Sequence, residues 1–164
     1  MKSNCRRLVA SSILVVVALA AAASPSRAVI APPGEPGERL VVTGRVFGPD
    51  GKPIAGIAVY AYHTDAKGYY RADRKMHGPD APPRLEGRLI TAPDGSYRIE
   101  TIKPAPHPSR TVRAHIHFNF HGGGLPDQYG TLWFEDDQPL PRDAAGVLHC
   151  TRDFHLSNRA GAES

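Results

Sequence analysis

The sequence predicts an all-β protein, a β-sandwich of short antiparallel strands that also carries one long Pro-rich loop. Short stretches of β-branched and aromatic residues alternate with Gly- and Pro-containing turns about every 8–12 residues, a spacing typical of sandwiches. The 164 residues include 16 Gly and 16 Pro and only 7% aromatic residues, a composition that argues against a helical bundle. Outside the first 28 residues, no apolar stretch of helical period extends beyond two turns.

Strands are expected wherever β-branched residues lie between Gly/Pro turns. In chain order these are residues 40–46, 57–62, 88–91, 96–102, 111–120, 130–134 and 147–156. Residues 93–95 (Pro-Asp-Gly) are a turn signal, so the strands on either side are expected to pair as a hairpin. The sandwich is expected to span residues 40–158, followed by a tail at 159–164. Residues 67–84 form a long, charged, Pro-rich loop, and loops of this length are often functional.

The first 28 residues are typical of an export signal peptide. Lys2, Arg6 and Arg7 form a basic stretch before an apolar run at residues 8–23. This run of 16 residues is shorter than the roughly 20 needed to cross a bilayer as a helix. Small residues follow, and the favoured cleavage point lies after Ala28.

Two alternatives stay open for this segment, a cleavage after Ala23 and a permanent N-terminal anchor. The Arg6-Arg7 pair also fits the twin-arginine route, which exports proteins that have already folded. We expect an exported protein, periplasmic or secreted, without stable membrane insertion after signal cleavage. Residues 29–39 follow as a Pro/Gly linker.

The formal charge of +4 does not indicate a nucleic-acid partner. Four of the 20 basic residues and none of the 16 acidic residues lie in the first 28 positions, so residues 29–164 carry 16 of each sign. The expected mature domain is therefore neutral, without the basic excess typical of nucleic-acid binding. It contains one cysteine, Cys150, so no intrachain disulfide can form, and a buried structural thiol is expected there.

The strand at residues 113–121 (RAHIHFNFH) has two chemically different faces. Side chains alternate along a strand, so its Ala, Ile and Phe residues point into apolar packing. His115 and His117 then lie on the other face with Arg113, near enough for two imidazoles to bind one metal ion. A solvated polar strand face is the alternative, because antiparallel sheets commonly expose one side.

A series of motifs surrounds this strand. Residues 44–59 (GRVFGPDGKPIAGIAV) open the domain, and residues 65–70 (DAKGYY), 87–91 (GRLIT), 94–97 (DGSY), 101–108 (TIKPAPHP) and 113–118 (RAHIHF) follow. The opening piece is shared with many transthyretin-like sandwich modules. In this order and spacing, the whole series resembles the intradiol ring-cleavage dioxygenases, the family of catechol and protocatechuate dioxygenases. The resemblance covers roughly residues 41–134 and implies a transthyretin-like sandwich.

Members of this family hold a mononuclear ferric ion with two tyrosinates and two histidines. The resemblance therefore implies Fe(III) as the cofactor. It implies Tyr70, His115 and His117 as metal ligands, with Tyr69 as the fallback for Tyr70.

The chain departs from the family pattern at two functional positions. The family's second ligand tyrosine falls at His107, which leaves three imidazoles and one phenolate, a set that also suits copper(II). A neutral His107 could instead be a base that takes a substrate proton, or a loop histidine that binds nothing. The family's active-site arginine falls at Val112. Arg113 is the preferred replacement and would stabilise developing negative charge, with Arg110 as the other candidate. A solvent-facing charge is the alternative for Arg113.

The expected function is that of a non-haem iron dioxygenase that uses O₂ to cleave catechol-type diols between the two hydroxylated carbons. Two alternatives stay open: a repurposed copper or other metal-binding protein on the same fold, and a transthyretin-like binding module without catalysis. Near the site, Tyr62, His63 and His77 are expected at the surface, and Trp133 and Phe134 in the core.

Overall fold

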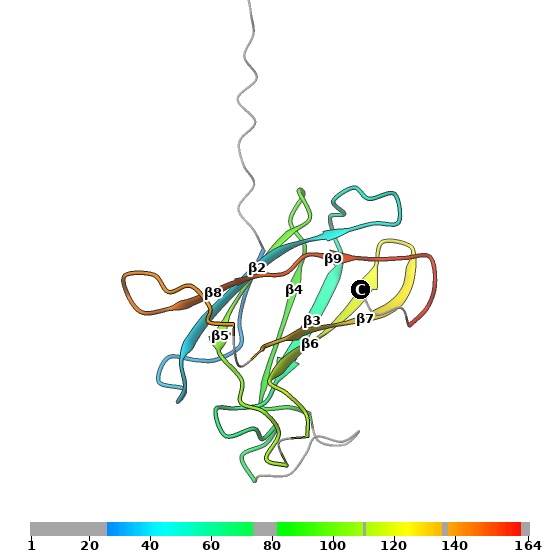
Figure 1. The fold of residues 1–164 in the computed structure, drawn as a ribbon. Coiled ribbons are helices and arrows are strands. Elements are labelled where there is room, and N and C mark those ends of the chain that lie inside the picture. The colour runs from blue at the N-terminus through cyan, green and yellow to red at the C-terminus, as the bar shows by residue number, and fades with distance from the viewer. Residues whose placement is uncertain (1–25, 74–81, 110, 136–137, 162–164) are drawn as a thin grey trace, which may run out of the picture.

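The computed structural model describes residues 26–73, 82–109, 111–135 and 138–161, which form strands and turns (Figure 1). The strands are β1 (Ser26–Val29), β2 (Arg39–Phe47), β3 (Ala58–His63), β4 (Leu85–Ile90), β5 (Ser96–Ile102), β6 (His115–Gly122), β7 (Leu125–Trp133), β8 (Leu148–Thr151) and β9 (Phe154–His155). These described residues contain no helix, which confirms the all-β class. The same ranges accordingly hold no helix able to span a bilayer.

Parts of the expected organisation lie outside the described residues. They are residues 1–25 of the expected signal, residues 74–81 of the Pro-rich loop, which include His77, and the end of the tail. Arg110 also lies outside the described residues.

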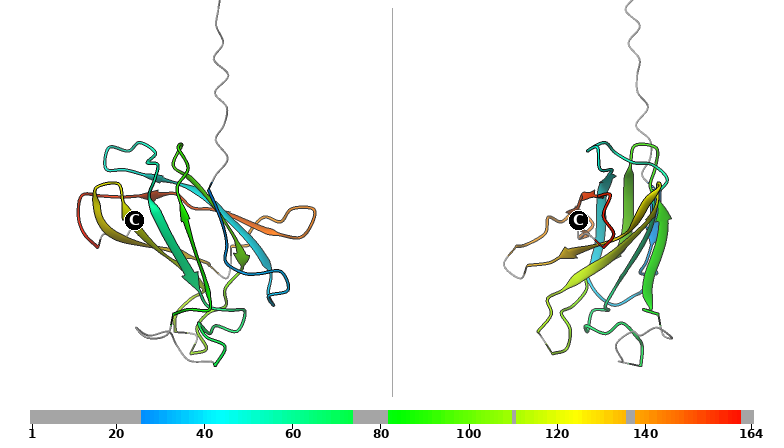
Figure 2. Two further views of the ribbon diagram at one scale, coloured as in Figure 1. Left: turned by 180° about the vertical axis from the view of Figure 1, so that it is seen from behind. Right: turned by 90° about the vertical axis from the view of Figure 1, so that its right-hand side faces the viewer.

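In the described part of the chain, the strands form two sheets that pack against each other, as Figure 2 shows from two further sides. One sheet has the order β1-β5-β2-β8, with β9 also paired to β2, and the other has the order β4-β3-β6-β7. The expected sandwich is confirmed. Most neighbouring pairs are antiparallel, but β1–β5, β2–β8 and β2–β9 are parallel.

The core lies between the sheets and contains large side chains from both. Tyr97 and Phe154 come from the first sheet, Phe118 and Phe120 from the second, and all four are fully buried. Their rings contact one another, with centroids 4.7 Å apart for Phe118 and Phe154. Cys150, expected as a buried thiol, is only half-buried at the edge of this core, and burial raises its pKa.

The prediction that the strands on either side of residues 93–95 pair as a hairpin is wrong. β4 pairs with β3 and β5 pairs with β2, so the two strands belong to different sheets. The N–H of Val46 donates to the carbonyl of Gly95 at 3.0 Å, whereas the N–H of Thr91 donates to Ile57 at 2.9 Å. The two ends of the turn are thus held by different sheets. Pro-Asp-Gly chemistry reverses the chain without specifying which strands pair.

Two boundaries next to the histidine strand also differ from expectation. β6 begins at His115 rather than at residue 111, because the N–H of His107 donates to Val112 at 3.1 Å and holds the preceding stretch as a loop. β7 begins at Leu125 rather than at residue 130, so β6 gains an antiparallel neighbour along its length.

β1 lies across the expected end of the signal peptide. It pairs in parallel with β5, and the Arg27 guanidinium makes two hydrogen bonds with the Glu100 carboxylate, at 2.8 and 2.5 Å. Ile30 and Ala31, expected to begin a linker, are buried in the core. We propose that cleavage occurs at the alternative point after Ala23, because this leaves β1 in the mature chain.

A chain that starts at Val29 should be less stable than one that starts at Ser24. Starting at Val29 deletes ladder hydrogen bonds to β5 and the buried Ala28. We expect the free energy of unfolding to fall by about 2–3 kcal/mol and the melting temperature by roughly 5–10 °C. Thermal denaturation of both chains measures the difference. Arg27→Gln in the longer chain is the control, because an exposed ion pair contributes little. Equal melting temperatures would contradict a structural role for β1.

Candidate functional site

β6 carries the two candidate metal-binding histidines on the outer face of its sheet. Ile116, Phe118 and Phe120 are fully buried in the core, as the two-residue period of a strand requires. The expected apolar face is therefore confirmed. His115 and His117 alternate with these residues and point away from the core. His115 is nonetheless buried, since the rings of His107 and Trp133 pack against it on this outer face.

The hydroxyl oxygen of Tyr70 lies beside the two histidines and is a third atom that could bind a metal. Tyr70 follows a turn after β3, and its side chain is buried. The Tyr70 Oη atom lies 3.2 Å from His115 Nε2 and 3.0 Å from His117 Nε2, and the two Nε2 atoms are 2.8 Å apart. Of the two adjacent tyrosines, Tyr70 is thus the one whose hydroxyl reaches both histidines.

The protonation of this triangle is set by its surroundings. His115 Nδ1 lies 2.7 Å from the carbonyl oxygen of Arg113. A carbonyl only accepts, so Nδ1 carries the proton, and the Nε2 of the neutral ring presents a lone pair to the triangle. Burial raises the pKa of the Tyr70 phenol, and the neighbouring Tyr62 raises this pKa further by a smaller amount. The phenol therefore needs a nearby cation to ionise at neutral pH.

His107 stands beside the triangle on a different loop. Its ring centroid lies 5.5 Å from that of Tyr70, edge-on, and 5.3 Å from that of His115. Its Nε2 atom is buried. A pocket of about 400 Å³ opens next to it, lined by Ala66, Lys67, Ala105, Pro106, His107, Pro108 and Arg113. The structure therefore brings His107 to the site, at the boundary between the triangle and this pocket.

Arg113 lies at the pocket wall, just before β6. Its guanidinium pairs with the Glu135 carboxylate and lies 5.2 Å from the ring centroid of Trp133. Trp133 in turn packs on His115, with centroids 4.8 Å apart. Phe134 is buried as expected, but the expectation of a buried Trp133 is wrong, since it is 41% exposed. It follows the alternation of β7 onto the outer face and covers His115 there.

Side chains alternate along β3, so its last two residues, Tyr62 and His63, point to opposite faces of the sheet. Tyr62 points outward and stacks on His117, with centroids 4.7 Å apart. His63 points inward and is fully buried, so the expectation that it lies at the surface is wrong. Its Nδ1–H donates to the carbonyl of Thr64 at 2.7 Å, and its Nε2 accepts from the hydroxyl of Thr101 at 2.6 Å. Applying strand parity to β3 would have predicted both positions.

Comparison with known proteins identifies the fold and the family. The family described as "Dioxygenase" matches residues 17–156. The chain is 36% identical over 135 residues to the protocatechuate 3,4-dioxygenase beta chain of Burkholderia cepacia, an alignment that covers 76% of this chain and 57% of that protein. This chain belongs to the intradiol ring-cleavage dioxygenase family.

Solved structures of intradiol dioxygenases share this fold. The dioxygenase domain of a dioxygenase–carbohydrate-binding protein fusion from Streptomyces sp. SirexAA-E is 28% identical with a TM-score of 0.63, covering 82% of this chain and 87% of that one. An intradiol ring-cleavage dioxygenase from Tetranychus urticae gives the same TM-score and coverage at 21% identity. The chain spans only 50% of the length of another relative, the chlorocatechol 1,2-dioxygenase of Rhodococcus opacus, at 29% identity.

The donor set of Tyr70, His115 and His117 fits the non-haem iron that intradiol dioxygenases use. Among the described residues, no three His, Cys, Asp or Glu side chains are grouped to hold a metal ion. With metal–ligand bonds of about 2 Å, separations of 2.8–3.2 Å correspond to angles of about 90–105° at one ion. Tyr70, His115 and His117 are therefore spaced to occupy one face of a single coordination sphere.

His63 should make the fold sensitive to acid. Burial lowers its pKa to about 4, so between about pH 6.5 and pH 4 the unfolded chain binds a proton that the folded chain does not. Stability should therefore fall with pH in this window, by about 2 kcal/mol between pH 7 and pH 5. Urea unfolding at both pH values measures the loss. His63→Gln should lack this part of the pH dependence, and an unchanged slope in the variant would contradict it.

Proposed function

We propose that this chain is a non-haem iron dioxygenase that uses O₂ to cleave catechol-type diols between the two hydroxylated carbons. The observation that carries the proposal is the triangle of Tyr70, His115 and His117, whose donor atoms lie 2.8–3.2 Å apart. Relatives named as protocatechuate, catechol and hydroxyquinol dioxygenases support this substrate class. The basic and apolar N-terminal segment supports action outside the cytoplasm.

Each residue of the site has a distinct role in this proposal. Tyr70, His115 and His117 would hold Fe(III), which supplies a Lewis-acidic, redox-active centre for the diol and O₂. His107, which lies beside this triangle and lines the pocket, would take the proton of a diol hydroxyl. In this proposal the Arg113 guanidinium at the pocket wall, which pairs with Glu135, would also stabilise the negative charge that develops on the diol. One ring C–C bond breaks and both atoms of O₂ enter the product, a muconate-type diacid.

Copper is the second candidate, and the replacement of a family tyrosine by His107 favours it. The His115 and His117 imidazoles and the Tyr70 phenol suit copper(II), which heads the affinity order of the divalent metals. The His107 imidazole, whose ring centroid lies 5.3 Å from that of His115, would have to move closer to join them. A copper protein on this fold would bind the metal stoichiometrically and leave catechol intact.

Iron-loaded protein should show a tyrosinate-to-iron absorption band that shifts with catechol, and it should form a muconate-type product. Tyr70→Phe removes a ligand, so we expect it to abolish the band and lower ring cleavage at least about 100-fold. Tyr69→Phe is the matched comparison and should keep the band. Visible spectra, bound-metal analysis and product analysis make the measurement. Loss of the band in the Tyr69 variant alone, or stoichiometric copper without cleavage, would refute the proposal.

His107→Ala should lower kcat for ring cleavage about 100-fold while the iron content stays the same, because the variant loses a base and keeps the metal ligands. Steady-state kinetics and iron analysis of the same preparation separate the two effects. His107→Tyr, which restores the family residue, should recover part of the lost rate. Full activity in the alanine variant would argue against the base, and loss of iron would make His107 a ligand instead.

A further inference from the structure

Tyr70 is held at the end of a tight turn that follows β3. The Asp65 side chain closes this turn, since its Oδ1 atom accepts the N–H groups of Lys67 and Tyr69 at 2.8 and 3.1 Å. The main chain closes it as well, because the N–H of Asp65 donates to the carbonyl of Tyr69 at 2.8 Å. Asp65 therefore sets the direction in which Tyr70 leaves the turn.

This turn is seated on the loop that carries His107. The N–H of Ala105 donates to the carbonyl of Asp65 at 3.1 Å. Gly68 has a φ of +87°, and a Cβ atom there would lie 2.0 Å from the carbonyl oxygen of Pro106, so only glycine permits this approach. The turn and the His107 loop are therefore packed as one unit.

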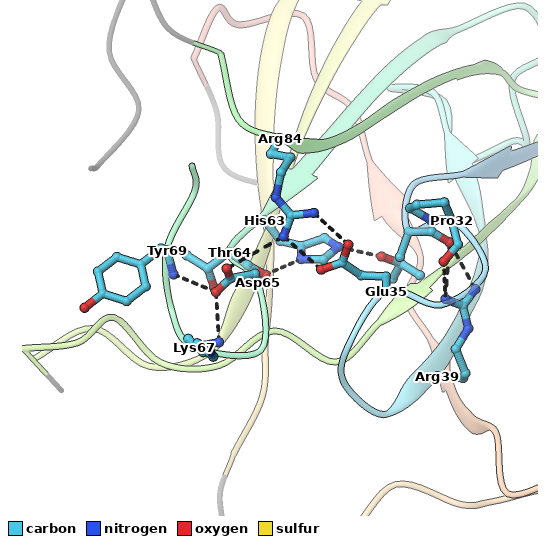
Figure 3. A network of polar contacts seen from close by, with 11 residues as sticks. Pro32, Glu35, Arg39, His63, Thr64, Asp65, Lys67, Tyr69 and Arg84 are labelled. Carbon is cyan, nitrogen blue, oxygen red and sulfur yellow. Dashed lines mark hydrogen bonds and ion pairs between the residues drawn. The ribbon is translucent and has the colours of Figure 1, made fainter. Parts of the chain in front are cut away.

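Arg84 holds this unit through both its main chain and its side chain. Its N–H donates to the carbonyl of Tyr70 at 2.8 Å. Its guanidinium makes two hydrogen bonds to the Glu35 carboxylate, at 2.6 and 2.8 Å, and lies 3.7 Å from Asp65 Oδ2 (Figure 3). The Glu35 side chain is 8% exposed, so water screens this contact less than an open surface pair. Arg84 holds the pKa of Glu35 below its usual range.

Glu35 is anchored in the loop between β1 and β2, which belong to the opposite sheet. Its N–H donates to the carbonyl of Pro32 at 3.2 Å. Arg39, at the start of β2, donates to the carbonyls of Ala31 and Pro32 at 3.2 and 3.3 Å (Figure 3). Arg84 thus connects the turn that carries Tyr70 to a loop fixed on the other sheet.

We propose that Arg84 is a positioning residue for Tyr70. Through Asp65 and Glu35 it fixes the turn so that the Tyr70 hydroxyl stays within reach of both histidines. This rests on the proposed function, because it concerns a residue proposed to bind the metal. Metal and catalytic sites need their donors held to within about 0.5 Å, which a single short turn does not secure alone. Arg84 does not line the pocket beside His107, and its side chain pairs with Glu35 and Asp65 rather than with a proposed ligand atom.

The first test measures iron affinity and the tyrosinate band in Arg84→Gln. We expect the affinity to fall about tenfold and the band to shift, at temperatures well below melting. Arg88→Gln is the matched control, because Arg88 is an exposed arginine on β4, the strand that begins directly after Arg84, and this variant should match the wild type. Glu35→Gln should reproduce the defect. The double variant should be no weaker than Arg84→Gln, since both changes break one interaction.

The second test needs no metal. Side-chain ¹⁵N signals of His115 and His117 in the metal-free protein report the distance of the Tyr70 hydroxyl, and they should change in Arg84→Gln but not in Arg88→Gln. Arg84→Lys, which keeps the charge without the double hydrogen bond, should give a smaller change. Wild-type protein that binds no iron would overturn the proposed function, while these signals still decide the role of Arg84. A lower melting temperature with unchanged histidine signals and unchanged iron affinity would make Arg84 merely structural.

Discussion

The two-residue period of β6 is the constraint on which the site depends. The alternation that packs Ile116 and Phe118 into the core also turns His115 and His117 to the outer face. Pairing with β3 on one side and β7 on the other fixes the register. A slip of one residue would turn the aromatic residues to the outer face and both imidazoles into the apolar core. The energy that folds the sandwich therefore also orients the site.

Strand alternation does not position the third donor, because Tyr70 comes from a loop. Its hydroxyl meets two imidazole nitrogens at 3.0 and 3.2 Å, and the carbonyl of Arg113 keeps the proton of His115 on the far side of the ring. The Tyr70 oxygen and the two imidazole nitrogens thus lie close together, and burial disfavours the ionised form of the Tyr70 phenol. A bound cation would relieve both conditions. The ring of Trp133 packs on the buried His115, and the ring of Tyr62 stacks on the partly buried His117.

The sequence predicts this fold and the core of this site for identifiable reasons. Strand periodicity sufficed for the sandwich and for the two faces of β6, and the family resemblance distinguished Tyr70 from Tyr69. The false hairpin at residues 93–95 arose because a turn signal specifies a reversal and not a partner. Parity applied to β3 would have placed His63 inside. The contact between Glu35 and Arg84 joins residues 49 positions apart, and no local pattern predicts such a pair.

The central claim is that Tyr70, His115 and His117 share one metal ion. The most direct test is anomalous diffraction at the iron absorption edge from crystals of the iron-loaded protein. The account predicts one strong peak about 2 Å from Tyr70 Oη and from both histidine Nε2 atoms. A peak elsewhere, for example beside the exposed His149 and Asp143 pair, with none at the triangle, would contradict it.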